Sequence, residues 1–280
     1  MKTTHKIAAA RAIYHVIHAG RRLLGRTDQE IAVRDGATYD LDLSQGIDFA
    51  IFLGNIYERR TKAALNKLVS PGSLVVDIGA NIGAHTLHLA KLVGPNGRVM
   101  AFEPTAFAFR KLQRNLELNP LLASRVEACH CFLTAADGAD VPNAIYSSWP
   151  LAIESGLHPK HLGREMRTEA AQARSLDSIL SERADRSVQL VKLDVDGFEC
   201  DVLAGATSML RDTRPIFVME LAPYVLEERG ASLDQLLSYF IPNGYVFYDE
   251  RTLKPLPSSA RALNRMIANG AGINAIARVA

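Results

Sequence analysis

The feature that most limits the fold is a regular alternation of short apolar runs with helical patterns from about residue 55 onward. Runs rich in β-forming residues, separated by segments of helical periodicity, are the signature of βαβ units and a mostly parallel sheet. Several runs are apolar nearly throughout, as is typical of strands covered on both faces. The pattern therefore predicts an α/β fold. The predicted strands are residues 73–79, 98–104, 126–134, 188–195, 215–221 and 245–250.

Length and composition exclude several classes of protein. The chain has 280 residues, of which 48% are hydrophobic, and this is enough to bury a substantial core. No apolar run reaches the roughly 18 residues that a membrane-spanning helix needs, so we expect no integral membrane association. The net charge of +2 argues against a nucleic-acid partner. Three cysteines are too few and odd in number for a disulfide framework, which favours a cytoplasmic protein.

The chain divides into three parts. Residues 1–54 are expected to form a helical N-terminal extension that packs on the main domain or on a second copy of the chain, as a homo-oligomer. The first acidic residue is Asp28, and six basic residues precede it. Binding to an anionic membrane surface and a targeting function are therefore alternatives for the extension. Residues 55–250 form the predicted α/β domain, and the Ala-rich residues 251–280 are predicted to be a weakly helical tail.

One long insertion interrupts the pattern, at residues 135–175, which are too polar and irregular for a simple crossover helix. Long insertions in compact α/β domains are usually functional or disordered. This insertion contains Trp149, Tyr146, His158 and His161. We predict a lid over a substrate site, with His158 and His161 as candidate bases, and a mobile surface loop as the alternative.

A glycine-rich turn, DIGANIG from Asp77 to Gly83, follows the first predicted strand. Such a turn into a helix lets the backbone approach a ligand. A dinucleotide fingerprint would need glycines where the chain has Asn81 and Ala84, and the P-loop pattern is missing as well. Glu103 ends the next strand, where a carboxylate binds both hydroxyls of an adenosine ribose and repels a 2′-phosphate. Two ligands remain, NAD and S-adenosylmethionine.

Three ordered stretches resemble a known family: VVDIGANIGAHTLHLAKLVGPNGRVMAFEP, ARSLDSIL and LVKLDVDGFECDVLAGATSMLRDTRPIFVMELAP. Over roughly residues 50–250 they resemble the FkbM-type S-adenosylmethionine-dependent methyltransferases. The resemblance implies a class I, Rossmann-like methyltransferase domain with a seven-stranded, mostly parallel sheet flanked by helices. It implies S-adenosyl-L-methionine as the cofactor and O-methylation of a small-molecule acceptor, such as a sugar or a glycosylated or polyketide-type metabolite. The insertion would then form the acceptor site.

The resemblance also assigns roles to residues at the donor site. The methionine part of the donor would be held by Asp77, Gly79, Asn81, Gly83 and Thr86. Glu103 would bind the ribose, and Phe132 would pack on the adenine. The chain departs from the family at Asp196, where a glutamate is usual, and at His85, where an aromatic residue is frequent and whose imidazole would reshape the mouth of the donor site.

Acidic residues at the carboxyl ends of the later strands are candidates for the reaction, because the ligand crevice of a parallel sheet lies at these ends. Methyl transfer to a hydroxyl needs a positioned acceptor and a base. We expect Asp194 to contact both donor and acceptor, with Glu220 beside it. Asp196 is the first candidate for the general base, and the alternative is that it caps the following helix.

Metal sites have weaker support in the sequence. Asp194, Asp196 and Glu220 are compatible with Mg²⁺, which prefers oxygen ligands. The triplet Cys129-His130-Cys131 is not expected to bind zinc, because alternation along a strand places His130 on the face opposite the two cysteines.

Two rival classes stay open. An NAD-dependent oxidoreductase on a similar sheet is disfavoured by the missing second glycine. A non-catalytic S-adenosylmethionine-binding module is disfavoured by the intact Gly79, Asn81, Gly83 and Glu103. Methylation of DNA or RNA amino groups is disfavoured because DVDG stands where those enzymes carry Asp or Asn before Pro-Pro and an aromatic residue.

Overall fold

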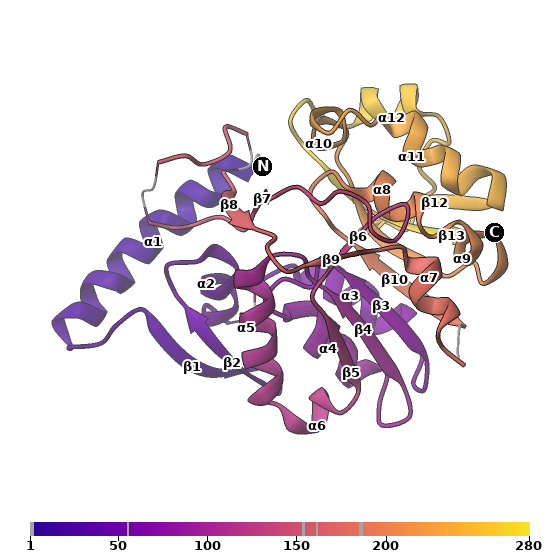
Figure 1. The fold of residues 1–280 in the computed structure, drawn as a ribbon. Helices are drawn as coiled ribbons and strands as arrows, with labels where there is room; N and C mark the ends of the chain where they lie inside the picture. The colour runs from indigo at the N-terminus through magenta and orange to yellow at the C-terminus, as the bar shows by residue number, and fades with distance from the viewer. Residues whose placement is uncertain (1–2, 55, 153–154, 161, 185–186) are drawn as a thin grey trace.

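The computed structural model describes all residues of the chain except 1–2, 55, 153–154, 161 and 185–186. Its centre is a seven-stranded sheet of order β12-β13-β11-β10-β3-β4-β5 (Figure 1). Only β13 is antiparallel to its neighbours, so the predicted mostly parallel sheet is confirmed. The strands of this sheet are β3 (Leu74–Ile78), β4 (Arg98–Phe102), β5 (Val126–Cys129), β10 (Val188–Leu193), β11 (Ile216–Leu221), β12 (Tyr245–Asp249) and β13 (Ile273–Val279).

The strand order contains a switch point between β3 and β10. The chain runs outward from β3 through β4 to β5, and then returns to the other side of β3 as β10. Connections that leave a switch point in opposite directions open a crevice at the carboxyl ends of the two strands. The turn after β3 and the turn after β10 therefore meet at one place.

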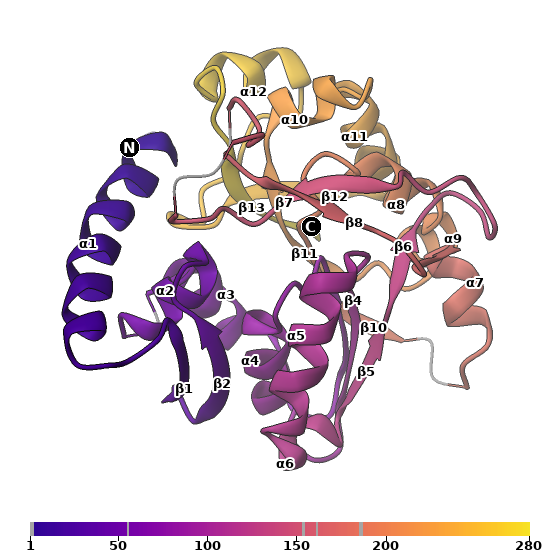
Figure 2. The same cartoon turned by 60° about the vertical axis from the view of Figure 1, so that its left-hand side comes forward.

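Helices cover both faces of the sheet (Figures 1 and 2). On one face Leu65 and Leu89 pack against Val75 and Val218 of the strands. The helices of this face are α3 (Arg59–Leu68) and α4 (Ala84–Leu92). The other face carries the larger core, under α7 (Leu176–Ser181), α8 (Glu199–Ala204), α9 (Thr207–Asp212), α10 (Pro223–Glu228), α11 (Leu233–Phe240), the short helix η1 (Ile241–Asn243) and α12 (Ala260–Met266). In the described part of the chain no helix meets the length and apolarity needed to span a bilayer.

The N-terminal part differs from the expected helical extension. It has the helices α1 (Thr3–Leu23) and α2 (Gly46–Phe52), but between them lies a hairpin of β1 (Gln29–Arg34) and β2 (Ala37–Asp42). The hairpin turn is Asp35-Gly36, and both residues have positive φ, as in a type I′ turn. The residues of β2 alternate between buried and half-buried. This Asp-Gly signal and the alternation of period two are in the sequence, and they mark a hairpin rather than a helix.

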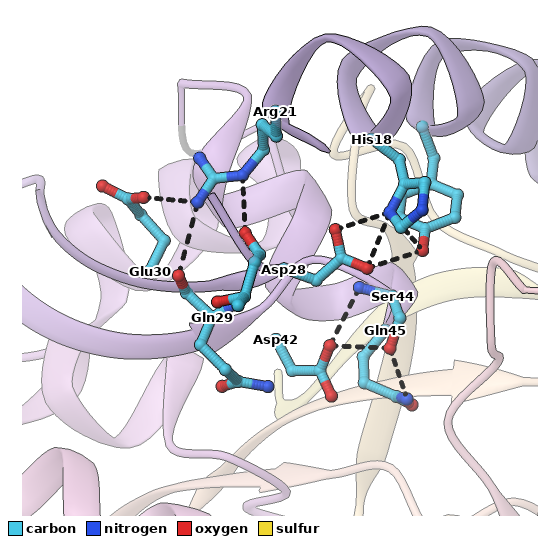
Figure 3. Close-up of polar contacts among 10 residues, drawn as sticks. His18, Arg21, Asp28, Gln29, Glu30, Asp42, Ser44 and Gln45 are labelled. Carbon is cyan, nitrogen blue, oxygen red and sulfur yellow. Dashed lines mark hydrogen bonds and ion pairs between the residues drawn. The ribbon is translucent and has the colours of Figure 1, made fainter. Parts of the chain in front are cut away.

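The hairpin and α1 share a core with the main domain. Tyr14 and Leu41 lie in one cluster with Ile82 and Leu112. The helix that carries Leu112 is α5 (Ala106–Glu117), followed by α6 (Pro120–Ala123). Within the N-terminal part, Arg21 of α1 donates to Glu30 over 2.7 Å (Figure 3). Tyr14 donates to Asp28 over 2.9 Å. The N-terminal part therefore packs on the main domain through this shared core.

The insertion at residues 135–175 contains strands. The predicted strand 126–134 is interrupted at His130, where β5 ends and β6 (Cys131–Leu133) leaves the sheet to pair with β9 (Gln172–Arg174). Between them β7 (Ala144–Ser147) and β8 (Arg164–Arg167) form an antiparallel pair. An isolated bridge between Gln45 and Pro150 joins the insertion to the start of α2.

The closing segment corrects the expectation for residues 251–280. It was expected to be a weakly helical tail, but β13 lies inside the sheet between β12 and β11. Three consecutive residues of β13, Ala275, Ile276 and Ala277, are buried. Alanine has a low β-propensity, so the intrinsic signal is helical, and burial on both faces overrides it.

Candidate active site

A single cavity of about 1210 Å³ joins the predicted donor turn to the predicted reactive acids. It lies at the carboxyl ends of β3, β4, β10 and β11, where the strand order switches. Five of the predicted donor-site residues and all three predicted catalytic acids line it. These residues are Gly79, Asn81, Glu103, Phe132, Asp194, Asp196 and Glu220, with Asp194 counted in both groups.

The turn after β3 depends on Gly79. A Cβ at this position would lie 1.9 Å from the carbonyl oxygen of Asp194, and its φ is +80°. No other residue type fits both the backbone conformation and the close approach. The turn after β3 and the residue that follows β10 are therefore in direct contact at the floor of the cavity.

Asn81 and Glu103 are held in fixed positions around the cavity. The Asn81 backbone, with φ of +49°, donates to one carboxylate oxygen of Glu103 over 2.9 Å. The other oxygen accepts from the backbone N–H of Thr105 over 2.9 Å and from its hydroxyl over 2.5 Å. Burial raises the pKa of Glu103, while these hydrogen bonds oppose the rise. The Asn81 amide also donates to Ser148 of the insertion over 3.0 Å, which ties the insertion to the donor turn.

Three predicted donor ligands lie behind the turn instead of facing the cavity. Asp77 and Thr86 are fully buried, and the Thr86 hydroxyl donates to Asp77 over 2.7 Å. Gly83 starts α4 with φ of +88°, and Leu112 fills the space beside it. None of these three lines the cavity in the described structure. Their geometry braces the turn, and direct contact of Asp77, Gly83 or Thr86 with the donor stays a prediction.

Lys192 is a site residue that the sequence analysis missed, because it stands inside the apolar run of β10. Its ammonium lies 3.2 Å from an oxygen of Asp194 and 3.9 Å from an oxygen of Asp77, and it donates to the Gly79 carbonyl over 3.3 Å. Burial alone would lower the pKa of Lys192, but the carboxylates of Asp194, Asp77 and Glu58 outweigh it and raise the pKa. The lysine stays charged and fixes the position of Asp194.

Asp196, in the turn after β10, and Glu220, near the end of β11, both line the cavity. Water reaches both side chains inside the cavity, but protein atoms surround them closely. This desolvation, with the negative charge of Asp194, raises the pKa of Asp196 to about 8. Desolvation and the charges of Asp194 and Asp196 likewise raise the pKa of Glu220 to about 8. Both carboxyl groups therefore exchange protons near neutral pH, as a general base requires.

The alternative interpretation of Asp196 as a helix cap is wrong. The residue at the N-cap of α8 is Phe198, and no side chain caps this helix. Asp196 has φ of +49°, in the turn that precedes the helix. Glu199 holds this turn, because its carboxylate accepts from the N–H groups of Val195 and Gly197, each over 3.4 Å.

The contact between Glu58 and His85 is another site feature that the sequence did not reveal. Their side chains meet at 2.6 Å, between Oε2 of Glu58 and Nε2 of His85. Burial would raise the pKa of Glu58, but the hydrogen bond and charge of His85 lower it to about 2. Tyr57 packs on His85 with ring centroids 5.7 Å apart, and Tyr57 and Glu58 both line the cavity. The histidine thus shapes the wall of the cavity through its partners.

The edge of the cavity under β13 also comes from distant parts of the chain. Asn274 of β13 pairs in register with Glu220 of β11. Its amide donates to Glu250 over 3.2 Å and to Thr61 over 3.1 Å. All four residues line the cavity. Sequence spacing gives no signal for this group, because it depends on the placement of β13.

The insertion contributes Trp149 but not His158. The Trp149 ring lies on Gly46, whose Cβ would be 2.0 Å from it, and the Gly46 N–H donates to the Trp149 carbonyl over 2.9 Å. Trp149 lines the cavity. His158 instead lies 3.2 Å from Glu228 and 5.1 Å from the ring of Tyr146, and it is absent from the cavity wall. The other candidate base of the insertion, His161, lies outside the described residues.

Metal binding has no support among the described residues. No group of three or more His, Cys, Asp or Glu side chains there has the arrangement of a metal site. His130 stacks on Phe109 with centroids 4.7 Å apart and lies 3.1 Å from the Pro104 carbonyl. The Mg²⁺ expectation therefore does not enter the proposed chemistry.

Comparison with known proteins places this site in a family. The family model described as the methyltransferase FkbM domain matches residues 77–247, which is more than half of the chain. The protein belongs to the FkbM methyltransferase family. This membership brings the class I methyltransferase fold and S-adenosylmethionine as the methyl donor of the family.

Relatives of this chain include proteins named as methyltransferases. Methyltransferase 1 of Beauveria bassiana is 32% identical over 53% of this chain and 64% of its own length. The 31-O-demethyl-FK506 methyltransferase FkbM of Streptomyces tacrolimicus is 31% identical over 48% of this chain and 60% of its own. A solved FkbM methyltransferase of Methylobacillus flagellatus KT has 16% identity and a TM-score of 0.42 over 82% of this chain and 53% of its own. The chain thus spans under two thirds of each of these relatives.

Proposed function

We propose that this protein transfers a methyl group from S-adenosylmethionine to a hydroxyl of a small-molecule acceptor, such as a sugar or a glycosylated or polyketide-type metabolite. The observation that carries the proposal is the single cavity that joins the donor turn to Asp196 and Glu220. Its volume of about 1210 Å³ exceeds the roughly 300–1,000 Å³ typical of a pocket for one drug-sized ligand. Donor and acceptor therefore have room side by side.

The residues present fit the donor. Gly79 lines the cavity, and its lack of a side chain lets the donor turn pack directly against the Asp194 carbonyl. Glu103 ends β4 at the position where a carboxylate binds ribose hydroxyls, and the Phe132 ring stands in the wall. Asp194, fixed by Lys192, faces the same space and suits the ammonium of the methionine part. When bound, the donor supplies an electrophilic methyl group on a sulfonium.

The acids that line the same cavity as the donor turn supply the base. Asp196 removes the proton of the acceptor hydroxyl, and the oxygen forms a bond to the methyl carbon as the bond from carbon to sulfur breaks. The base takes up one proton, and the acceptor leaves as a methyl ether. Asp194 orients both molecules, because its backbone meets the donor turn at Gly79 and its carboxylate lines the same cavity as the two acids. Proximity in one cavity provides most of the catalytic effect.

A panel of hydroxylated acceptors with isotope-labelled donor tests the proposal directly. We expect label in the ether oxygen position of one acceptor class, with transfer unchanged after extensive chelation. The Asp196→Asn variant tests the base, since asparagine keeps the shape of the side chain but cannot accept the proton. Label on nitrogen or carbon, or a wild-type rate in the Asp196→Asn enzyme, would contradict the proposed chemistry. Binding of donor without transfer to any acceptor class would favour the non-catalytic module.

A further inference from the structure

The helix α1 has an apolar face that no element of the described structure covers. On a helix of 3.6 residues per turn, seven exposed positions fall within an arc of about 120°. All seven are apolar, and we call them the outer face: Ala9, Ala12, Ile13, Val16, Ala19, Gly20 and Leu23. The large side chains among them are 47% (Ile13), 74% (Val16) and 89% (Leu23) exposed. In both overall views α1 runs along the edge of the molecule (Figures 1 and 2).

The opposite face of α1 already packs on the protein. Tyr14, Ile17 and Arg21 point inward, and Arg21 and His18 bind the hairpin through Glu30 and Asp28 (Figure 3). The helix is therefore fixed in orientation, and its outer face is turned away from the core. Such a face on an anchored helix marks an interaction site, since soluble proteins rarely leave contiguous apolar patches open.

The charges around the outer face indicate which kind of partner it binds. Residues 1–27 contain no acidic residue. Arg22 and Arg26 are exposed at the end of the helix, and His15 borders the outer face. An apolar helical face bordered by basic residues complements an anionic bilayer surface. A second copy of α1 would instead bring like charges together.

The outer face also continues into the cavity. Ala9 and Ile13 belong to both, and Ile56, which is 49% exposed, lines the cavity as well. These three exposed apolar side chains mark the side of the cavity mouth that adjoins the outer face. A surface that covers the outer face would therefore lie next to the mouth, where an amphiphilic acceptor can enter without crossing water.

We propose that the outer face of α1 docks the protein on the surface of an anionic lipid bilayer, with the mouth of the cavity beside the lipid. The apolar side chains enter the boundary between headgroups and acyl chains, and Arg22 and Arg26 lie among the phosphates. The docking is peripheral and reversible, and it is independent of the proposed methyl transfer.

Flotation of the full-length protein with vesicles tests the docking. Vesicles of phosphatidylcholine alone are compared with vesicles in which about a third of the lipid is phosphatidylglycerol. We expect binding only to the anionic vesicles, and a loss of binding at high salt because screening shortens the reach of the charges. Val16→Asp and Leu23→Asp each reduce the bound-to-free ratio about tenfold or more, because each places a charge in the apolar boundary. Arg22→Glu reduces it on anionic vesicles as well.

The matched control is Leu121→Asp, at a residue that is 80% exposed on α6 and outside the outer face. It should bind vesicles like the wild type. Stabilisation by S-adenosylhomocysteine should be the same in all these proteins, which separates a failure of docking from a failure of the methyltransferase proposal. Absence of wild-type binding, or equal loss with Leu121→Asp, would overturn the docking. So would a wild-type dimer that Val16→Asp converts to a monomer, since a second copy would then cover the face.

Discussion

At the scale of single residues, the proposed chemistry depends on two carboxyl groups whose pKa values are raised by their surroundings. Asp196 and Glu220 line one cavity, where desolvation and the charge of Asp194 raise the pKa of both, and the charge of Asp196 adds to the rise at Glu220. A proton leaves this pair more easily once a cation binds nearby. The donor carries a positive sulfonium, so its binding favours the charged form that acts as a base.

The pH dependence of the rate follows from the pKa of Asp196, about 8. A base must be deprotonated, so in the enzyme without donor the reactive form is the minority below pH 8, and the rate at donor concentrations well below KM should fall about tenfold per pH unit. Above pH 8 the rate should reach a plateau. The Asp196→Asn enzyme should lose about 10²–10⁴-fold in kcat, the usual contribution of a general base. A rate that is flat from pH 6 to 9 would contradict the assignment.

Gly79 gives a test of the donor turn. Gly79→Ala places a Cβ 1.9 Å from the Asp194 carbonyl, so the turn must move and binding of S-adenosylhomocysteine should be lost. Gly138→Ala is the matched control, because Gly138 has a similar positive φ of +72° but no atom within 4 Å of the added Cβ. Both variants carry a strain of about 1–2 kcal/mol in the left-handed backbone region. Only Gly79→Ala should abolish binding, measured by calorimetric titration. Equal binding in the two variants would remove Gly79 from the donor site.

The donor turn could be predicted from the sequence because its signal is local. Gly79, Asn81 and Glu103 follow two consecutive strands, so the spacing of the motif can be read directly from the sequence. The pair of Glu58 and His85, and the group around Asn274, join residues far apart in the chain, so no spacing reveals them. Lys192 is hidden for another reason: a charged residue in an apolar strand looks like an interruption until its carboxylate partners are known.

At the scale of elements, β13 completes the sheet and carries Asn274 into the cavity wall. Its sequence INAIARV alternates small and branched side chains, so it fits a helix and a strand equally well. In the structure it is a strand. The hairpin of β1 and β2 differs from β13, because its Asp-Gly turn is a hairpin signal in the sequence itself. The strand conformation of β13 depends instead on tertiary packing.

A charge in the centre of β13 tests its role. Ala277 is fully buried, so Ala277→Asp should lower the free energy of unfolding by several kcal/mol, or prevent folding, because an unpaired carboxylate is buried. Arg278→Asp next to it is exposed, with its guanidinium 4.8 Å from the Tyr248 ring centroid, and should cost only about 0.5–1 kcal/mol. Urea unfolding compares the two. Similar stability of both variants would mean that residues 273–279 are a dispensable tail.

At the scale of the whole molecule, three parts of the chain that are distant in sequence enclose one cavity. The N-terminal helices contribute Ala9 and Gly46, the insertion contributes Trp149, and the closing strand contributes Asn274. The contact of Trp149 with Gly46 and the bridge from Gln45 to Pro150 join the first two parts. We therefore propose that segments outside the glycine-rich turn select the acceptor, and that the turn identifies a cofactor class and not a substrate.

The central claim is that this cavity binds S-adenosylmethionine, and thermal unfolding with the product S-adenosylhomocysteine tests it most directly. At a ligand concentration of about 100 times Kd, binding adds about 2.7 kcal/mol of stability, which corresponds to a rise in Tm of several degrees. We predict this rise with S-adenosylhomocysteine, no rise with NADH, and no rise for Gly79→Ala with either ligand. Stabilisation by NADH alone would contradict the claim and favour a dinucleotide enzyme. Stabilisation by neither would show that the cavity does not bind the donor.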